Sequence, residues 1–268
     1  MKAIFLTSCK NYREKDSIDA LKYAAKSLEI TACILDSDII LDEFVQLCLK
    51  LSIPIFNREN VCAIFLEHKT QKPKIGLAYH YHSIVNKEIL EFPENGIINF
   101  HPAPVTEHRG VSGCTYAILH KYAEWGVTAH YMDEKVDSGD VIKVRRFDIA
   151  KHDCTALSLQ RVNYSHYLEL YKEIVDILAT GVIPKGTPQE PDGVYYSRKQ
   201  LEKDKSVHLT DTKETVDHKI KAMWFPPFHG ANVTIDGEKY TLVNQRILDE
   251  LGKIYEIAYG KSYNNIGE

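Results

Sequence analysis

The sequence has 268 residues, of which 44% are apolar, 26% charged and 10% aromatic, a composition typical of a folded globular protein and not of a disordered or collagen-like chain. Its longest uninterrupted apolar run has only the six residues from Val61 to Leu66, far below the roughly 18 that a membrane-spanning helix needs. The first apolar residues are soon followed by Thr7 and Ser8, so the start does not resemble a signal segment. We therefore expect a cytoplasmic protein with no membrane contact.

The charge balance argues against a nucleic-acid partner. Lys and Arg number 33 and Asp and Glu 37, which gives a net charge of −4. From Gly181 to the end there are 12 basic and 13 acidic residues, so the average hides no basic tail. Proteins that hold nucleic acid through its phosphates normally carry a basic surplus. We expect no nucleic-acid partner.

The cysteines and histidines do not form a metal-binding pattern. The six cysteines are scattered without a C-x-x-C pair, which is typical of buried thiols in a reducing compartment. His80 and His82 alternate in Tyr79-His80-Tyr81-His82 and could both face a metal, but the sequence places no third ligand near them. We predict no metal.

The first half of the chain alternates between two hydrophobic periodicities. Short apolar runs predict strands over residues 3–6, 31–35, 53–56, 74–78 and 96–100. Ser17 is predicted to cap a first helix with Ile18, Leu21 and Leu28 on its buried face, and a second helix follows from Ile40 to Leu51. This alternation predicts an α/β fold with a mostly parallel sheet and helices on both faces.

The pattern changes in the second half. Strands are expected over residues 126–132 and 141–147, joined by the turn Asp137-Ser138-Gly139-Asp140 into an antiparallel hairpin or edge extension. A helix is predicted over residues 111–123, and a long one over 155–179 that ends at Gly181. We predict a catalytic domain over residues 1–180.

Residues 181–268 are predicted to form a small α+β subdomain. A short helix is expected over 215–223, and two strands over 232–235 and 239–243 flank Asp236-Gly237, a strong hairpin signal. The subdomain is expected to contact substrate or to form a homodimer interface, because Trp224-Phe225-Pro226-Pro227 and the hairpin offer apolar surface.

The turn after the first strand has no phosphate-binding motif. Thr7 to Asn11 contains neither a dinucleotide-binding glycine pattern nor a P-loop. Nicotinamide-dependent and ATP-dependent functions therefore lose their main sequence support.

Asn99 and His101 are the first candidates for chemistry. Residues two apart on a strand share a face, so both point away from the side of Ile98 and Phe100. Pro102 ends the strand there, at the carboxyl edge where open α/β sheets place ligands. An amide donor beside an imidazole suits oxyanion stabilisation and proton transfer in acyl transfer, although both side chains could simply cap the strand.

Asp137 lies in the predicted turn downstream and reaches the same edge if the hairpin packs beside the strand of His101. A carboxylate there could orient His101 or move a proton through water. The plainer interpretation of Asp137 is a solvated turn residue.

The segments Asn99-Phe100-His101-Pro102, His108-Arg109-Gly110, 126–132 (Gly-Val-Thr-Ala-His-Tyr-Met) and Asp137-Ser138-Gly139-Asp140 closely resemble the folate-dependent formyltransferases. The resemblance covers about the first 180 residues and rests on two separated motifs in the right order. It implies a Rossmann-like formyltransferase fold, a catalytic triad of Asn99, His101 and Asp137, and N10-formyltetrahydrofolate as formyl donor.

The same resemblance suggests where the donor binds. The pterin ring is expected to lie against the backbone of His82, Ser83, Ile84 and Val85 and against the loop that contains Asp133, Glu134 and Val136.

The tail segments Tyr195-Tyr196-Ser197-Arg198-Lys199 and 219–227 look most like the sugar N-formyltransferases, which act on nucleotide-linked amino sugars. The implied function is N-formylation of a dTDP-, UDP- or GDP-linked amino sugar for surface polysaccharide biosynthesis. Lys221 departs from the family, where arginine is frequent, as do Val105 and His108.

Five residues are candidates for substrate contact. Arg109, before the predicted helix, could meet a pyrophosphate or form a surface salt bridge. Trp224 and Phe225 could stack on a base or fill the core of the tail. Lys10 and Asn11, past the first strand, are weaker candidates.

Three alternatives share the catalytic motif or the binding surfaces. A methionyl-tRNA formyltransferase is disfavoured by the acidic balance of the chain. A formyltetrahydrofolate hydrolase would pass the formyl group to water. A silent folate or nucleotide-sugar binding protein would not need the complete N-x-H and D-x-G-D motifs.

Overall fold

The computed structural model describes residues 1–8, 14–36, 42–57, 72–150, 154–189 and 194–259. The chain divides into two compact units. The first unit comprises Met1–Gly110, Trp125–Phe147 and Val162–Tyr195, and the second comprises Val111–Glu124, Asp148–Arg161 and Tyr196–Glu268. The domain boundary after residue 180 stays a prediction from the sequence.

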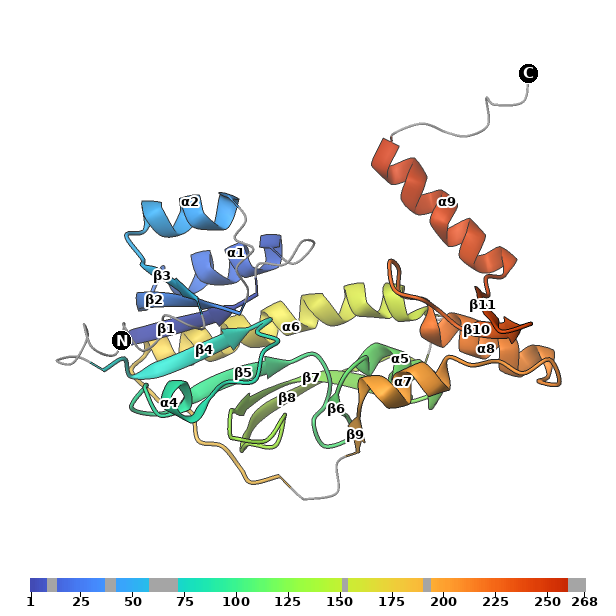
Figure 1. Cartoon of the computed structure of the whole chain (residues 1–268). Helices are drawn as coiled ribbons and strands as arrows, with labels where there is room; N and C mark the ends of the chain where they lie inside the picture. The colour runs from blue at the N-terminus through green and yellow to red at the C-terminus, as the bar shows by residue number, and fades with distance from the viewer. Residues whose placement is uncertain (9–13, 37–41, 58–71, 151–153, 190–193, 260–268) are drawn as a thin grey trace. The chain divides into compact units, whose positions relative to one another are not determined.

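The first unit is built on a seven-stranded sheet with the strand order β3-β2-β1-β4-β5-β7-β8 (Figure 1). Its strands, in chain order, are β1 (Lys2–Thr7), β2 (Glu29–Leu35), β3 (Ile55–Asn57), β4 (Ile75–Tyr79), β5 (Ile97–His101), β7 (Glu124–Tyr131) and β8 (Val141–Asp148). The first five pair in parallel, whereas β7 runs antiparallel to β5 and β8 forms the edge. The predicted mostly parallel sheet with an edge extension is confirmed.

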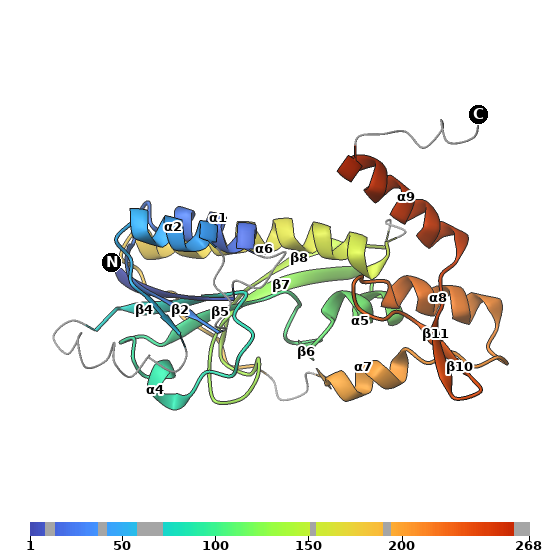
Figure 2. The same ribbon diagram turned by 45° about the horizontal axis from the view of Figure 1, so that its top comes forward.

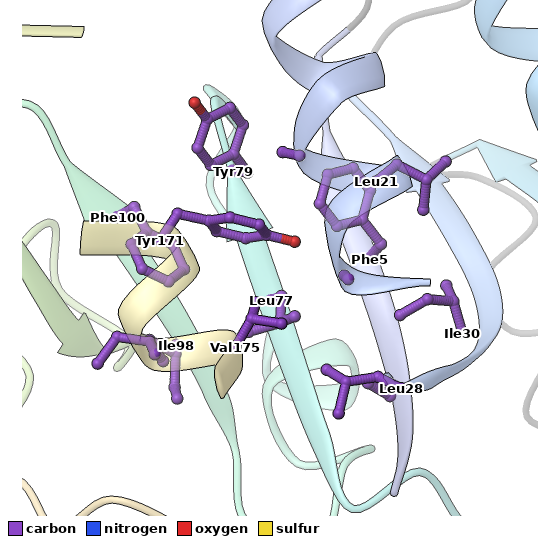
Figure 3. Close-up of a cluster of buried hydrophobic side chains, with 14 of the residues drawn as sticks. Phe5, Leu21, Leu28, Ile30, Leu77, Tyr79, Ile98, Phe100, Tyr171 and Val175 are labelled. Carbon is purple, nitrogen blue, oxygen red and sulfur yellow. The ribbon is translucent and has the colours of Figure 1, made fainter. Parts of the chain in front are cut away.

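Helices cover both faces of this sheet. One face carries α1 (Glu14–Ala24), α2 (Asp42–Lys50) and the long α6 (Ala156–Ala179), and the other carries α4 (Lys87–Leu90) (Figure 2). Side chains of Leu21 on α1, Leu77 on β4 and Tyr171 on α6 meet in the larger core (Figure 3). That core also contains Ile98 and Phe100, the two apolar residues that alternate with Asn99 and His101 on β5.

The predicted start of the first helix is wrong. The helix α1 begins at Glu14, so Ser17 lies inside it and is not its cap. The Ser17 side chain is buried, and its hydroxyl lies 2.8 Å from the Thr7 hydroxyl and 3.4 Å from the Ser8 carbonyl oxygen. Ser17 therefore satisfies polar groups at the end of β1, which the helical pattern alone does not reveal.

The helix expected over residues 111–123 is shorter than predicted. It is α5 (Gly113–Leu119), and Arg109 does not precede it directly but lies on the short strand β6 (Arg109–Gly110), paired with β9 (Tyr195–Tyr196). Gly110 and Ser112 have φ values of 92° and 62°. Because this left-handed backbone cannot continue a right-handed helix, the helix starts only after Ser112.

The second unit contains α5, α7 (Arg198–Asp204), α8 (Lys213–Met223) and α9 (Gln245–Tyr259), together with a hairpin. The strands β10 (Asn232–Ile235) and β11 (Glu238–Thr241) pair antiparallel, as predicted. Asp236 and Gly237 have φ values of 50° and 85°, the left-handed pair that a tight type I′ turn requires. None of the helices in the described ranges combines the length and apolarity needed to cross a bilayer.

The packing of β4 gives a first prediction. Leu77 is fully buried in the larger core, so Leu77→Ala should lower the free energy of unfolding by about 2–5 kcal/mol, since it leaves a cavity. Leu49→Ala, at a position 65% exposed on α2, should change it by less than about 0.5 kcal/mol. Urea unfolding followed by circular dichroism measures both; equal losses would contradict this description of the core.

Candidate active site

Asn99 and His101 lie at the carboxyl end of β5, in the sheet of the first unit. Ile98 and Phe100 point into the larger core, whereas Ile97 belongs to the smaller core on the other side of the sheet. Asn99 and His101 therefore share the face of Ile97, as the strand alternation predicts. Only 7% of the His101 side chain is exposed.

The structure brings Asp137 to the same place. Its carboxylate oxygen Oδ1 lies 3.4 Å from Nδ1 of His101, and its side chain is only 11% exposed. The other carboxylate oxygen, Oδ2, accepts a hydrogen bond from the backbone N–H of Gly110 at 3.0 Å. A buried carboxylate needs such partners, because leaving water without them costs several kcal/mol.

The loop around Asp137 is held by hydrogen bonds from the Gln189 side chain to its backbone and by a close approach of Gly139 to β7. Asp137 has a φ of 54°, a left-handed conformation that Asp tolerates better than most residues. Gln189 donates from its amide nitrogen to the carbonyl oxygens of Asp137 at 3.2 Å and Gly139 at 2.6 Å. A Cβ on Gly139 would lie 2.0 Å from the Tyr131 carbonyl oxygen, so only glycine fits where the loop crosses the end of β7.

His130 completes the cluster, although the sequence motifs alone assign it no role of its own. It lies opposite Asn99 in the antiparallel register of β5 and β7. Its Nε2 is 3.1 Å from the Asn99 amide nitrogen and 3.8 Å from Asp137 Oδ1. The alternation along β7 marks His130 as facing one side, but only the strand pairing reveals which residue it meets.

The hydrogen bonds of His130 define its tautomer. Its Nδ1 lies 2.7 Å from the carbonyl oxygen of Tyr131, so this nitrogen carries the proton and donates. Burial lowers the pKa of His130, against a smaller opposing effect of the Asp137 carboxylate. A neutral His130 with an unprotonated Nε2 accepts from the Asn99 amide and thereby orients it.

One ring nitrogen of His101 makes no hydrogen bond within the described residues. Its Nδ1 faces Asp137, and its buried Nε2 has no hydrogen-bond partner within the described residues. A buried ring nitrogen without a protein partner is suited to bind a substrate atom or to exchange a proton with it. The cluster thus offers an imidazole 3.4 Å from a carboxylate, and an amide donor that shares a strand face with this imidazole and contacts His130.

The residues expected to line the pterin site lie in two segments of the first unit. In the first, the His82 N–H donates to the Asp36 carboxylate at 2.9 Å, Ser83 is half-buried, Ile84 is exposed, and Val85 is buried in the smaller core. The Val85 side chain therefore anchors this segment in the smaller core, and the Asp36 carboxylate holds its backbone at His82.

The second segment is the loop after β7. The Asp133 carboxylate accepts from the Ser138 hydroxyl at 2.7 Å and from the Lys135 N–H at 3.0 Å, while Glu134 and Val136 are exposed. The Asp133 side chain is thus used to close the loop that carries Asp137.

The residues expected to contact the substrate belong to different parts of the chain. Lys10 and Asn11 lie outside the described residues. Arg109 is half-buried on β6, where its backbone N–H donates to the backbone carbonyl oxygen of Val194 at 3.0 Å. Trp224 is buried in the core of the second unit, and its contact with substrate stays a prediction. Phe225 is half-buried and stacks on Phe228 with ring centroids 6.0 Å apart.

Residues 57–173, which include the cluster of Asn99, His101 and Asp137, match the family model described as formyl transferase. Over these residues the chain is similar to the formyl transferases, which confirms the resemblance seen in the sequence motifs. The seven-stranded sheet is the Rossmann-like sheet that this resemblance implies.

Curated proteins similar to this chain include a methionyl-tRNA formyltransferase. The chain is 27% identical over 196 residues to the methionyl-tRNA formyltransferase of Listeria monocytogenes, a match that covers 72% of this chain and 62% of that protein. It therefore spans about three fifths of the length of this relative.

Solved structures with the same fold include sugar-related enzymes. A 4-N formyltransferase from Francisella tularensis superposes with a TM-score of 0.73 at 17% identity, over 91% of this chain and 96% of that one. An N-formyltransferase from Helicobacter canadensis, in complex with folinic acid and dTDP-3-aminofucose, superposes with a TM-score of 0.66 at 19% identity, over 91% of this chain and 88% of that one.

The histidines near the end of β4 were the only candidates for a metal in the sequence. The rings of His80 and His82 lie 6.4 Å apart, and in the part of the chain that the structure describes no three His, Cys, Asp or Glu residues are grouped so as to hold a metal ion.

The buried state of His130 predicts an acid-sensitive stability. The pKa of His130 is lower in the folded protein than the ordinary 6.5. Below pH 6.5, His130 therefore binds a proton in the unfolded chain more readily than in the folded chain. The free energy of unfolding should therefore fall as the pH drops below 6.5. His130→Gln removes this contribution, so the variant should lose less stability than the wild type between pH 7 and about pH 5.

Urea unfolding at a series of pH values measures the difference. Thr234→Ser, at an exposed position on β10, changes no titratable group and should keep the wild-type dependence of the free energy of unfolding on pH. If the free energy of unfolding depended on pH in the same way in the wild type and in His130→Gln, the neutral, buried state of His130 would be contradicted.

Proposed function

We propose that this chain transfers a formyl group from N10-formyltetrahydrofolate to the amine of a nucleotide-linked amino sugar. The observation that carries the proposal is the 3.4 Å approach of Asp137 to His101 beside Asn99, in a domain that matches the formyl transferase family. Support for the acceptor comes from the tail motifs and from the dTDP-3-aminofucose and folinic acid held by a structural neighbour.

The chemistry required is acyl transfer between two nitrogen atoms. The uncharged sugar amine attacks the formyl carbon, a C–N bond forms, and the carbonyl oxygen takes the negative charge. The Asn99 amide and the His101 ring are the groups suited to stabilise this oxyanion. The bond from the formyl carbon to the folate nitrogen then breaks as the carbonyl re-forms.

One proton has to move for the transfer to balance. The attacking amine becomes cationic and must lose a proton, while the leaving folate nitrogen must gain one. His101 Nε2 is suited to carry this proton, and the Asp137 carboxylate 3.4 Å from Nδ1 stabilises the imidazolium that forms in between. Water held by Asp137 is the alternative carrier.

The two substrates would bind on either side of this cluster. In the proposal, the pterin lies against the backbone of residues 82–85 and the loop of Asp133, Glu134 and Val136. The pyrophosphate of the nucleotide meets Arg109, whose guanidinium suits bidentate phosphate contacts. Lys10, Asn11 and Phe225 remain candidate contacts of the sugar nucleotide.

A second candidate is the formylation of methionyl-tRNA, which the 27% identical relative favours. The catalytic steps would be the same, because that acceptor is also an amine. The net charge of −4 and the nearly equal numbers of basic and acidic residues after Gly181 argue against it, since tRNA binding draws on a surplus of positive charge.

The acceptor is tested with the full chain and N10-formyltetrahydrofolate. The purified protein is offered dTDP-, UDP- and GDP-linked sugars with an amine on C3 or C4, charged methionyl-tRNA, and no acceptor, and mass spectrometry follows the gain of one formyl group. We expect formylation of at least one sugar nucleotide. Formylation of tRNA alone, or loss of the formyl group to water, would overturn the proposed acceptor. Sedimentation of the same sample tests the homodimer that the sequence predicts.

The roles of the three residues are tested by substitution. His101→Ala and Asp137→Asn should each lower kcat by about 10²–10⁴-fold, because they remove the proton carrier or the charge that stabilises it. His166→Asn, which changes a histidine on α6 that stacks on Phe147, should leave kcat unchanged. Near-normal turnover of His101→Ala with saturating substrates would show that the proton and the oxyanion are handled elsewhere.

A further inference from the structure

The hydroxyl of Tyr167 lies between β4 and β5, at the carboxyl end where the two strands separate. It accepts a hydrogen bond from the backbone N–H of His80 at 3.2 Å and donates one to the carbonyl oxygen of Phe100 at 2.7 Å. Tyr167 comes from α6, is 1% exposed, and stacks on the ring of His80 with centroids 4.7 Å apart. All these residues belong to the first unit.

The Tyr167 hydroxyl lies where the next hydrogen bond between β4 and β5 would be expected. The Gly76 N–H donates to the Gly96 carbonyl at 2.9 Å, and the strands stay in register up to the pair of Ala78 and Asn99. Because a parallel ladder repeats every two residues along each strand, its last bond would join the His80 N–H to the Phe100 carbonyl.

The Tyr167 hydroxyl bridges these same two backbone groups. It therefore connects the two strand ends by two hydrogen bonds in place of one direct bond. The backbone of His80 turns away at this point with a φ of 56°.

A second contact from α6 holds the other side of His101. The Asn163 amide nitrogen donates to the Pro102 carbonyl oxygen at 2.8 Å, and Asn163 is fully buried. Phe100 and Pro102 are the two neighbours of His101 in the chain. Their carbonyl groups are thus both held by side chains one helical turn apart on the same face of α6.

We propose that Tyr167 is a positioning residue for the proposed formyl transfer. By holding the Phe100 carbonyl it fixes the backbone from which His101 reaches Asp137, and Asn163 supports it from the far side. This inference rests on the proposed function, but its structural part concerns only the His101–Asp137 contact and can be measured without substrate.

The chain offers a matched control one turn along the same helix. Tyr171 is also fully buried in the larger core, beside Tyr79 and Phe100 (Figure 3). Its hydroxyl makes no hydrogen bond to the described residues. Tyr167→Phe and Tyr171→Phe therefore delete the same atom from the same core, and only the first deletion breaks the bridge between β4 and β5.

The kinetic test compares the two variants with the amino-sugar acceptor identified above. Tyr167→Phe should lower kcat by about tenfold and leave KM for both substrates within about twofold, because a small shift of His101 spoils the reaction geometry more than binding. Tyr171→Phe should match the wild type. Val175→Ala, a change in the same core two turns further along α6, serves as a destabilised control and should keep its kcat.

The second readout is the pH titration of the His101 ring by NMR on histidine-labelled full chain, with its signal assigned from its loss in His101→Asn. Tyr167→Phe should shift the titration midpoint of His101, and Tyr171→Phe should not. If the wild type formylates no amine, the proposed function fails while this titration still tests the positioning role. If Tyr167→Phe matches Tyr171→Phe in both kcat and titration midpoint, the positioning role is wrong.

Discussion

The contact between the Asp137 carboxylate and the His101 imidazole is the constraint on which the rest of the site depends. Both side chains are nearly buried, so neither group can rely on water to stabilise a charge. The carboxylate is tolerated there because Gly110 donates a backbone N–H to it and because His101 lies 3.4 Å away. These partners stabilise the buried carboxylate, and they leave His101 Nε2 as the ring nitrogen that the proposed proton transfer would use.

The neutral state of His130 follows from the same balance of charges. A positive charge on His130 would compete with His101 for the single carboxylate and would remove the acceptor that orients Asn99. Burial keeps the pKa of His130 low and thus leaves the Asp137 charge to His101. The Asp137 carboxylate is therefore left to interact with a charge on His101, as the proposed proton transfer through His101 requires.

Much of this arrangement was predictable from the sequence, because apolar runs and period-two alternation are local properties. They located β1, β2, β4 and β5 and placed Asn99 and His101 on one face. What failed depended on partners distant in the sequence. Ser17 resembles a helix cap but is used by the end of β1, and the left-handed backbone at Ser112 delays the start of α5. The role of His130 needed the register of β5 and β7.

The long helix α6 illustrates the same point in a different way. Its pattern of apolar residues predicts only that one face is buried, and in such a pattern Tyr167 and Tyr171 are equivalent large side chains. The structure distinguishes them by their hydroxyl groups. The Tyr167 hydroxyl bridges the backbone of His80 and Phe100, whereas the Tyr171 hydroxyl makes no hydrogen bond to the described residues. A hydroxyl is useful at the first position because two buried backbone groups need a partner, and it is expendable at the second. One face of α6 therefore contributes in two ways: Tyr171 packs in the core, and Tyr167, one turn earlier, holds the backbone next to His101.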